Sequence, residues 1–158
     1  LDEKIKTREI SKFYLPAIQG TMPQRSGTLE NYIFKDARKN QVYVRSEPER
    51  GAKSAVTKYR TLAVSGGISL VECELVTGRT HQIRAQFAAA GHPLLGDGKY
   101  GSERFNRTFG ENHQALCSYK VVFRFTSDAG CLAYLAGKSI TVTGVDFAQK
   151  FFPDYTII

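Results

Sequence analysis

The feature that most constrains this 158-residue chain is the stretch at residues 77–101, which reads TGRTHQIRAQFAAAGHPLLGDGKYG. Within it, Ile83, Phe87 and Ala90 recur at i, i+4 and i+7, the spacing of one face of an α-helix. This spacing predicts a short amphipathic helix whose apolar stripe faces a core. Arginines, histidines, glutamines, glycines and an aspartate surround the stripe, so polar chemistry concentrates beside the helix.

The ends of the predicted helix carry their own signals. We expect Thr80 to cap the N-terminus through its hydroxyl, and Gly91 to end the helix in a left-handed conformation. Thr77 and Gly78 lie where a strand passes into the helix, a junction whose backbone amides favour an anion. Arg84 lies at the edge of the buried face, so its guanidinium needs a carboxylate or phosphate partner.

Seven other segments have strand character and are separated by turn residues. They are residues 13–18, 29–34, 41–44, 57–64, 68–76, 115–125 and 139–142. Ser65-Gly66-Gly67 predicts a hairpin turn between two of them. We also expect a helical tail over 1–10, a polar surface loop over 102–112, a short helix over 132–135 and a packed tail over 147–158. No repeat or linker divides the chain, which predicts one domain.

Two ungapped motifs in the central stretch resemble a known family. T-G-R-T-H-Q-I-R at 77–84, and G-H-P-L-L-G-D at 91–97 with Tyr100-Gly101 after it, resemble the signature of RluA-type RNA pseudouridine synthases. Upstream, K-F-Y-L at 12–15 resembles the K-x-Y-L strand of that family. The alternating Ala, Thr and Tyr at 55–59 resemble its A-x-T-x-Y strand.

The resemblance implies an α+β fold with a mixed, largely antiparallel sheet and flanking helices. Residues 1–158 then form the C-terminal portion of a single pseudouridine synthase catalytic domain. The implied activity is that of an isomerase that converts uridine to pseudouridine in ribosomal or transfer RNA. The family works without a metal or an organic cofactor, and a monomer is its usual state.

The same resemblance assigns site residues. Arg84 matches the arginine that pairs with the family's catalytic aspartate, and Tyr14 matches the tyrosine whose ring lies against the target base. A cleft lined by both residues is therefore expected. Leu116 falls where the family has a leucine near the base. The expected substrate-binding set is completed by Arg79, His81 and Gln82, and for Arg79 two roles stay open: contact with an RNA phosphate, or bracing of its loop.

The catalytic aspartate of the family belongs to an H-R-L-D motif that precedes the K-x-Y-L strand. These 158 residues contain no H-R-L-D, and Asp2 is the only aspartate before Tyr14. We therefore expect a fragment that is inactive alone. The alternative is a non-catalytic RNA-binding module on the same scaffold, and a third reading is a basic protein-interaction domain.

Two positions depart from the family pattern. Gln86 stands where many members have a histidine, and Leu116-Cys117-Ser118 stands where the family has L-H-A. Neither change removes a residue assigned to the chemistry, so the expected fold and family are unaffected.

The charge of the chain suits a polyanion. Its net charge is +7 and its sequence pI is about 9.4, which favours nucleic acid as a partner. Residues 35–60 hold eight basic and three acidic residues, most of the excess. Two interpretations stay open for this segment: a rim that contacts RNA phosphates, or a solvated loop and exposed strand face.

The remaining composition excludes several classes. Cys73, Cys117 and Cys131 are scattered and odd in number, which favours reduced thiols and a cytoplasmic protein over a disulfide scaffold. No apolar run reaches the ~20 residues of a membrane helix. His81 and His92 lack a third nearby ligand, so structural hydrogen bonding is expected of them and metal binding is not.

Overall fold

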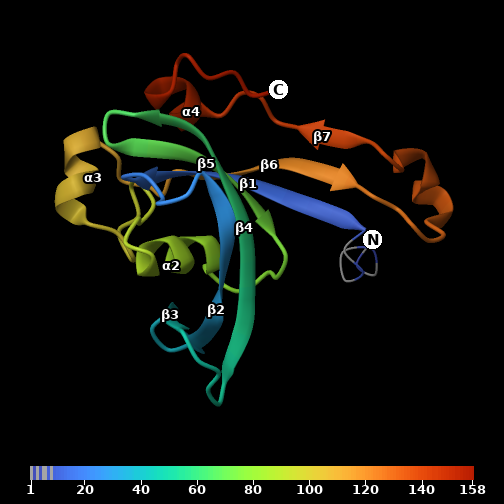
Figure 1. Ribbon diagram of the computed structural model, residues 1–158, viewed down its shortest axis with the longest axis horizontal. Coiled ribbons are helices and arrows are strands. Elements are labelled where there is room, and N and C mark those ends of the chain that lie inside the picture. Colours follow the sequence, from blue (N-terminus) through green and yellow to red (C-terminus); the bar gives the residue numbers. More distant parts are fainter. Residues whose placement is uncertain (1, 3, 5–6, 8) are drawn as a thin grey trace.

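The computed structural model describes residues 2, 4, 7 and 9–158 and shows an α+β fold (Figure 1). The strands are β1 (Ile10–Gln19), β2 (Ser26–Asp36), β3 (Gln41–Arg45), β4 (Ala52–Ser65), β5 (Ile68–Leu75), β6 (Leu116–Phe123) and β7 (Ser139–Thr141). The helices are α2 (Gln82–Ala89), α3 (Glu103–Phe109), α4 (Asp146–Phe151) and the 3₁₀ helix η1 (Gly130–Leu135). The seven strands form one sheet in the order β3-β2-β4-β5-β1-β6-β7, and each neighbouring pair is antiparallel. The expected fold class is confirmed.

The hairpin of β4 and β5 turns on two glycines, as expected. Gly66 and Gly67 have φ angles of 57° and 83°. A two-residue turn whose twist matches the flanking strands needs positive φ at both positions, which glycine adopts without steric cost.

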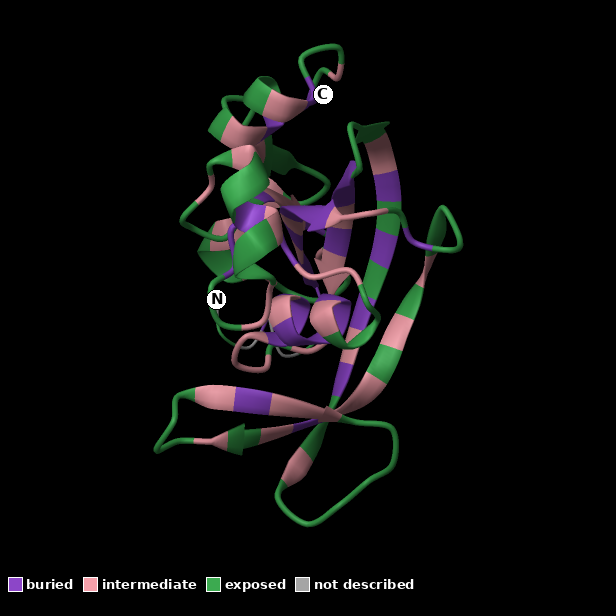
Figure 2. Cartoon of the chain, turned by 90° about the vertical axis from the view of Figure 1, so that its left-hand side faces the viewer, coloured by how far each residue is buried: buried purple, intermediate pink, exposed green. Residues whose placement is uncertain are grey.

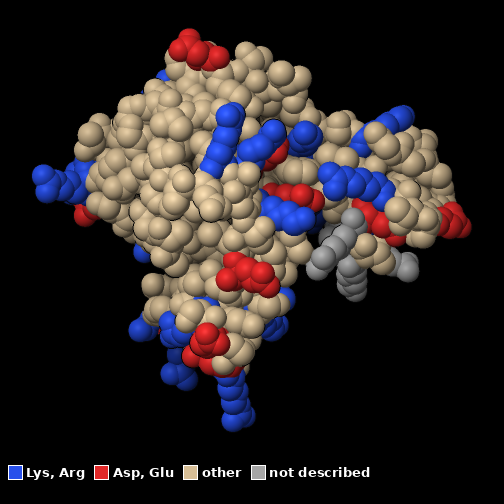
Figure 3. Space-filling view, viewed as in Figure 1, with Lys and Arg blue, Asp and Glu red and all other residues tan. Residues whose placement is uncertain are grey.

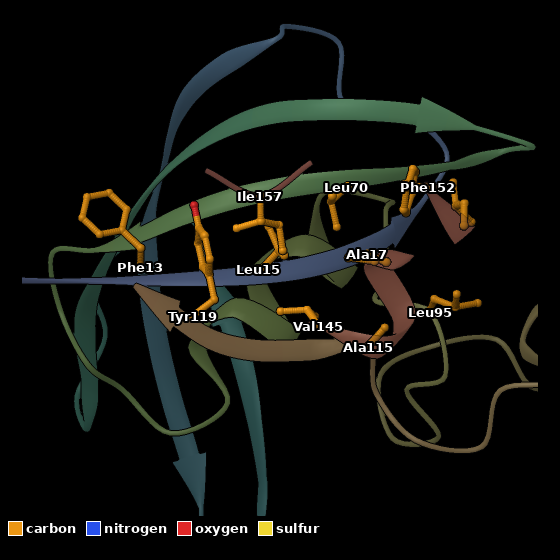
Figure 4. Close-up of a cluster of buried hydrophobic side chains, with 12 residues drawn as sticks. Phe13, Leu15, Ala17, Leu70, Leu95, Ala115, Tyr119, Val145, Phe152 and Ile157 are labelled. Atoms are coloured by element: carbon orange, nitrogen blue, oxygen red, sulfur yellow. The ribbon is translucent and has the colours of Figure 1, made fainter. Parts of the chain in front are cut away.

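Residues of β1 alternate between two apolar layers because successive side chains of a strand point to opposite faces. Phe13, Leu15 and Ala17 belong to the first layer, which the C-terminal segment covers with Val145, Ala148, Phe152 and Ile157 (Figure 4). The expected packed tail at residues 147–158 is confirmed, and it includes α4.

Helix α2 covers the other face of the sheet (Figure 2). Ile83 and Phe87 are buried there against Val71 and Cys73 of β5. The prediction is wrong for the third residue of the apolar stripe, because Ala90 follows the end of α2 and is exposed. Gly91 does take the left-handed conformation, with φ of 85°.

The predicted cap of α2 is also wrong. His81 occupies the N-cap position with φ of 52°, and no side chain caps the helix. Position 81 is a rare left-handed site for a residue other than glycine, and it turns the chain sharply from the junction at Gly78 into α2.

A second difference lies at residues 102–112, where the expected loop contains α3. The Ser102 hydroxyl accepts a hydrogen bond from the amide of Phe105, and Gly110 ends the helix with φ of 69°. Phe105 and Phe109 lie one turn apart and pack against the first apolar layer. Half of the expected helical tail at 1–10 lies outside the described residues, and Ile10 at its end already belongs to β1.

Beyond the end of β5 the sheet continues as a protruding extension (Figures 1 and 2). Leu75 of β5 pairs with Thr57, so residues 30–56, here called the arm, form a three-stranded extension of β2, β3 and the first part of β4. A small cluster of Ile33, Val42 and Ala55 packs with Ala85 of α2 and attaches the arm to the body.

Candidate nucleic-acid interface

A cleft of about 510 Å³ opens where β5 ends. β1 and β4 both continue past Leu75, so the sheet divides there and leaves a hollow between its two halves. The walls come from residues 10–12 and 14 of β1, from Lys58 and Glu74, and from residues 75–79 that lead into α2. The first half of the T-G-R-T-H-Q-I-R motif thus forms one wall of the cleft.

The cleft is basic. Its lining includes four basic side chains and one acidic one: Lys12, Lys58, Arg79, Arg124 and Glu74. The one acidic group is only loosely paired, since Glu74 Oε1 lies 3.8 Å from Arg124 Nη1. Figure 3 shows basic side chains both across the middle of the molecule and on the arm. This balance suits the phosphates of a nucleic acid.

Tyr14 lies in this cleft, half-buried, on the same side of β1 as α2. Its ring packs against the apolar layer that contains Ile83 and Phe87, and Leu116 packs against the same layer. The structure therefore brings Tyr14 and Leu116 to one face of the sheet. Leu116 is not part of the lining of the cleft.

Arg84 is not among the residues that line this cleft, so the expectation of a hollow lined by both Tyr14 and Arg84 is not met here. Its guanidinium instead meets Asp97 with two hydrogen bonds, Nε–Oδ2 at 2.7 Å and Nη2–Oδ1 at 2.9 Å. We expected a carboxylate from outside these residues, and the structure supplies one from within. The reason is the turn at residues 94–101, which directs Asp97 back toward α2.

The pair is buried and electrostatically matched. The Asp97 side chain is fully buried and that of Arg84 is 13% exposed. Burial alone would raise the pKa of Asp97, but hydrogen bonds from Arg84 and from the amides of Tyr100 and Lys99 hold it below its ordinary value. The hydrogen bond with Asp97 in turn raises the pKa of Arg84. Asp97 thus accepts hydrogen bonds from the amides of its own turn as well as from Arg84.

Tyr100 links this pair to the arm. Its ring centroid lies 5.1 Å from Arg84 Cζ, and its hydroxyl accepts a hydrogen bond from the amide of Val42 at 3.0 Å. The hydroxyl also lies within hydrogen-bond distance of His81 Nδ1, at 2.8 Å. Burial, then Arg84 and Lys99, lower the pKa of His81, so the ring is neutral at pH 7.

Gln82 is buried and its side-chain amide is fully engaged within the protein. Its Oε1 accepts from the Thr77 hydroxyl and the Arg79 amide, and its Nε2 donates to the Val56 carbonyl and the Thr57 hydroxyl. The expected contact with substrate stays a prediction. In this structure Gln82 fastens the junction at residues 77–82 to β4.

Gln86 completes this fastening, and the sequence reasoning missed its role. Its Oε1 accepts from the Thr57 hydroxyl at 2.6 Å, and its Nε2 lies within reach of the Leu29 and Ala55 carbonyls and Asn31 Oδ1. The available signal was the recurrence of glutamine at i and i+4 beside the apolar stripe, which directs both amides toward the sheet.

Arg79 braces its loop, which was one of its two expected roles. Its Nε donates to the Ser54 carbonyl at 2.9 Å, joining the junction to the arm. Its side chain also lines the cleft that holds Tyr14. Within residues 2, 4, 7 and 9–158, its two terminal nitrogens have no hydrogen-bond or ion-pair partner.

The two histidines of the motifs make structural hydrogen bonds, as expected: His81 to Tyr100, and His92 Nδ1 to the Gln19 carbonyl at 3.0 Å. Across the described part of the chain, no three His, Cys, Asp or Glu residues are placed to hold a metal ion. In the same part, every helix is too short or too polar to cross a bilayer.

Comparison with known proteins agrees with the motifs. Residues 1–89 match the family described as RNA pseudouridylate synthase. The chain is 38% identical over 130 residues to an uncharacterized RNA pseudouridine synthase, YhcT, of Bacillus subtilis, covering 77% of this chain and 38% of that protein. It is 30% identical over 117 residues to the mitochondrial tRNA pseudouridine(32) synthase of Saccharomyces cerevisiae, covering 73% of this chain and 25% of that protein. The chain therefore spans less than half the length of these relatives.

A solved structure shares the fold. Human RNA Pseudouridylate Synthase Domain Containing 1 superposes with a TM-score of 0.66 at 22% sequence identity. The superposition covers 94% of this chain and 68% of the human one.

Proposed function

Because this chain belongs to the RNA pseudouridine synthase family, we propose that it forms the RNA-facing part of an enzyme that isomerises uridine to pseudouridine. The observation that carries the proposal is the cleft at the end of β5, where Tyr14 and four basic side chains surround a wall built by the family motif. The relatives support RNA as the substrate, and transfer or ribosomal RNA is the class we propose.

The chemistry fits this cleft. Isomerisation breaks the bond between uracil and ribose, turns the base and joins it again through carbon, so the base must leave its stack. A flipped base needs an aromatic surface to replace its former stacking, and the half-buried ring of Tyr14 offers one. The phosphates on either side need cations, which Lys12, Lys58 and Arg79 supply.

We further propose that these 158 residues do not turn over RNA alone, because the sequence contains no H-R-L-D motif. The pairing of Arg84 with Asp97 uses Nε and Nη2. Its Nη1 has no hydrogen-bond partner among the described residues, so the two N–H groups of that nitrogen are left for a second carboxylate. A catalytic aspartate from a preceding segment would need to approach from that side.

The test is release of tritium from RNA whose uridines are tritiated at C5, since isomerisation exchanges that position. We expect release by the product of the native reading frame and none by these 158 residues. Turnover by the 158 residues would contradict the proposed inactivity. A native product that binds RNA without releasing tritium would instead favour the non-catalytic RNA-binding module.

A further inference from the structure

A second hollow adjoins the cleft. It measures about 280 Å³ and lies between the arm and the loop that precedes α2. Its lining includes Lys35 and Lys53 of the arm, and it shares Gly78 and Arg79 with the cleft. The two hollows therefore meet at one glycine and one arginine.

Arg79 is held in a defined position at this meeting point. The hydrogen bond from Nε to the Ser54 carbonyl anchors the guanidinium, and the terminal nitrogens stay unpaired within the described residues. Gly78 is exposed, and an added Cβ there would meet no atom within 4 Å. An anchored arginine with two unpaired ends beside open space is suited to a phosphate, which guanidinium groups bind with two parallel hydrogen bonds.

The two lysines of the second hollow are also uncommitted. Lys35 and Lys53 are exposed, and within the described residues neither makes an ion pair or hydrogen bond through its ammonium. Two other cations nearby are engaged, since Arg45 pairs with Glu49 and Lys99 donates to the Asn40 carbonyl. The remaining cations of the arm, Arg38, Lys39 and Arg50, line neither hollow. Lys35 and Lys53 therefore line the same hollow as Arg79, and their ammonium groups have no partner among the described residues.

We propose that the cleft and the second hollow form one phosphate track. An RNA strand whose target base lies against Tyr14 would continue past Arg79 and along the arm, with its phosphates bound by Arg79, Lys35 and Lys53. This proposal rests on the proposed function and adds to it the direction of the strand. Arg79 then has both of its expected roles, because the nitrogen that braces the arm is not one of those that meet the phosphate. Within the basic segment at 35–60, the cations that contact RNA phosphates are then those that line the two hollows: Lys35, Lys53 and Lys58.

The test is binding of a fluorescent single-stranded RNA, containing uridine, to the 158-residue chain over a series of salt concentrations. Removing one cation that binds a phosphate lowers the slope of log affinity against log salt by about 0.7 for single strands. The double variant Lys35→Gln/Lys53→Gln is expected to lower the slope by about 1.4 and to weaken binding about tenfold at low salt.

The matched control is Arg104→Gln/Lys138→Gln, which removes the same charge from exposed sites outside both hollows. We expect a much smaller change of slope for the control. Equal reductions of affinity in the two double variants would show that only net charge matters, and would overturn the track.

Two variants of Arg79 test its contact with a phosphate. Arg79→Lys keeps the charge but not the forked geometry, so we expect weaker binding than wild type and tighter binding than Arg79→Gln. Identical binding by both Arg79 variants and wild type would also overturn the track. Tritium release by the native product tests the proposed function separately. If the enzyme is active and the arm variants bind RNA as well as wild type does, the proposed function stands and only the proposed track is overturned.

Discussion

Arg84 and Asp97 form a two-pronged ion pair that joins α2 to the turn after it, with Nε–Oδ2 and Nη2–Oδ1 distances of 2.7 Å and 2.9 Å. Asp97 also accepts hydrogen bonds from the amides of Lys99 and Tyr100. One carboxylate therefore sets both the position of Arg84 and the shape of the turn that carries Tyr100.

Removing that carboxylate charge is expected to destabilise the fold. Asp97→Asn leaves the buried guanidinium of Arg84 without its counter-charge, and such a change costs about 3 kcal/mol. Urea unfolding of the chain measures the change. The control Asp154→Asn alters an exposed carboxylate and is expected to stay within about 0.5 kcal/mol of wild type. Equal stability of Asp97→Asn and wild type would contradict the importance of the pair.

The buried side-chain amide of Gln86 is expected to stabilise the fold about as much as the Arg84–Asp97 pair does. Gln86→Ala leaves the buried Thr57 hydroxyl and the buried Ala55 carbonyl without this partner, and each unsatisfied buried group costs about 1–3 kcal/mol. We predict a decrease of about 3 kcal/mol in the free energy of unfolding. The exposed Gln114 offers a matched control, and Gln114→Ala should be neutral. A neutral Gln86→Ala would mean that water satisfies the groups it leaves.

The burial of His81 beside Arg84 and Lys99 predicts a pH dependence of stability. The pKa of His81 is lowered from 6.5, first by burial and then by Arg84 and Lys99. Well above pH 6.5 the ring is neutral in both the folded and unfolded states, and its contribution to stability is complete. As the pH falls below 6.5 the unfolded state takes up a proton first, so the free energy of unfolding decreases.

His81→Asn isolates this contribution, because asparagine tolerates the left-handed backbone of position 81 and does not titrate. Unfolding measured at about pH 7.5 and about pH 5.5 should show a larger decrease in stability for wild type than for the variant. The remaining histidines, His92 and His113, are common to both proteins. The same decrease in both would assign the pH dependence to other groups.

Tyr14 is expected to act through its ring. In the product of the native reading frame, Tyr14→Leu should lower kcat/KM for tritium release by about 10- to 100-fold, which corresponds to the ~1–3 kcal/mol of stacking one base. Tyr14→Phe keeps the ring and should retain most of the stacking. Tyr134→Leu changes an exposed tyrosine in η1 and serves as the control. Comparable reductions in Tyr14→Phe and Tyr14→Leu would assign the role to the hydroxyl.

Much of the sheet was predictable because local signals determine it. Segments of strand character separated by turn residues indicated the strands, and Gly66-Gly67 indicated the hairpin between β4 and β5. The family was also predictable from its ungapped motifs, and it is confirmed. Helix α3 was missed because its polar residues outnumber Phe105 and Phe109, whose packing depends on the distant C-terminal segment.

The site was predictable only in part, because side-chain partners depend on how distant segments fold together. The sequence placed Arg84 at the edge of a buried face but could not show that the turn at 94–101 brings Asp97 to it. For the same reason, the buried amides of Gln82 and Gln86 looked like polar positions beside an apolar stripe. Their partners are Val56 and Thr57 of β4 and Asn31 of β2, more than 20 residues away in sequence.

Photo-cross-linking of RNA that contains 4-thiouridine is the most direct measurement of where this protein holds its substrate. Irradiation of the complex followed by peptide mapping identifies the residues beside the modified base. We predict cross-links in the peptides that contain Tyr14 and residues 76–79, and their disappearance in Tyr14→Leu. Cross-links confined to surfaces away from the end of β5, with none in these peptides, would contradict the proposed substrate cleft.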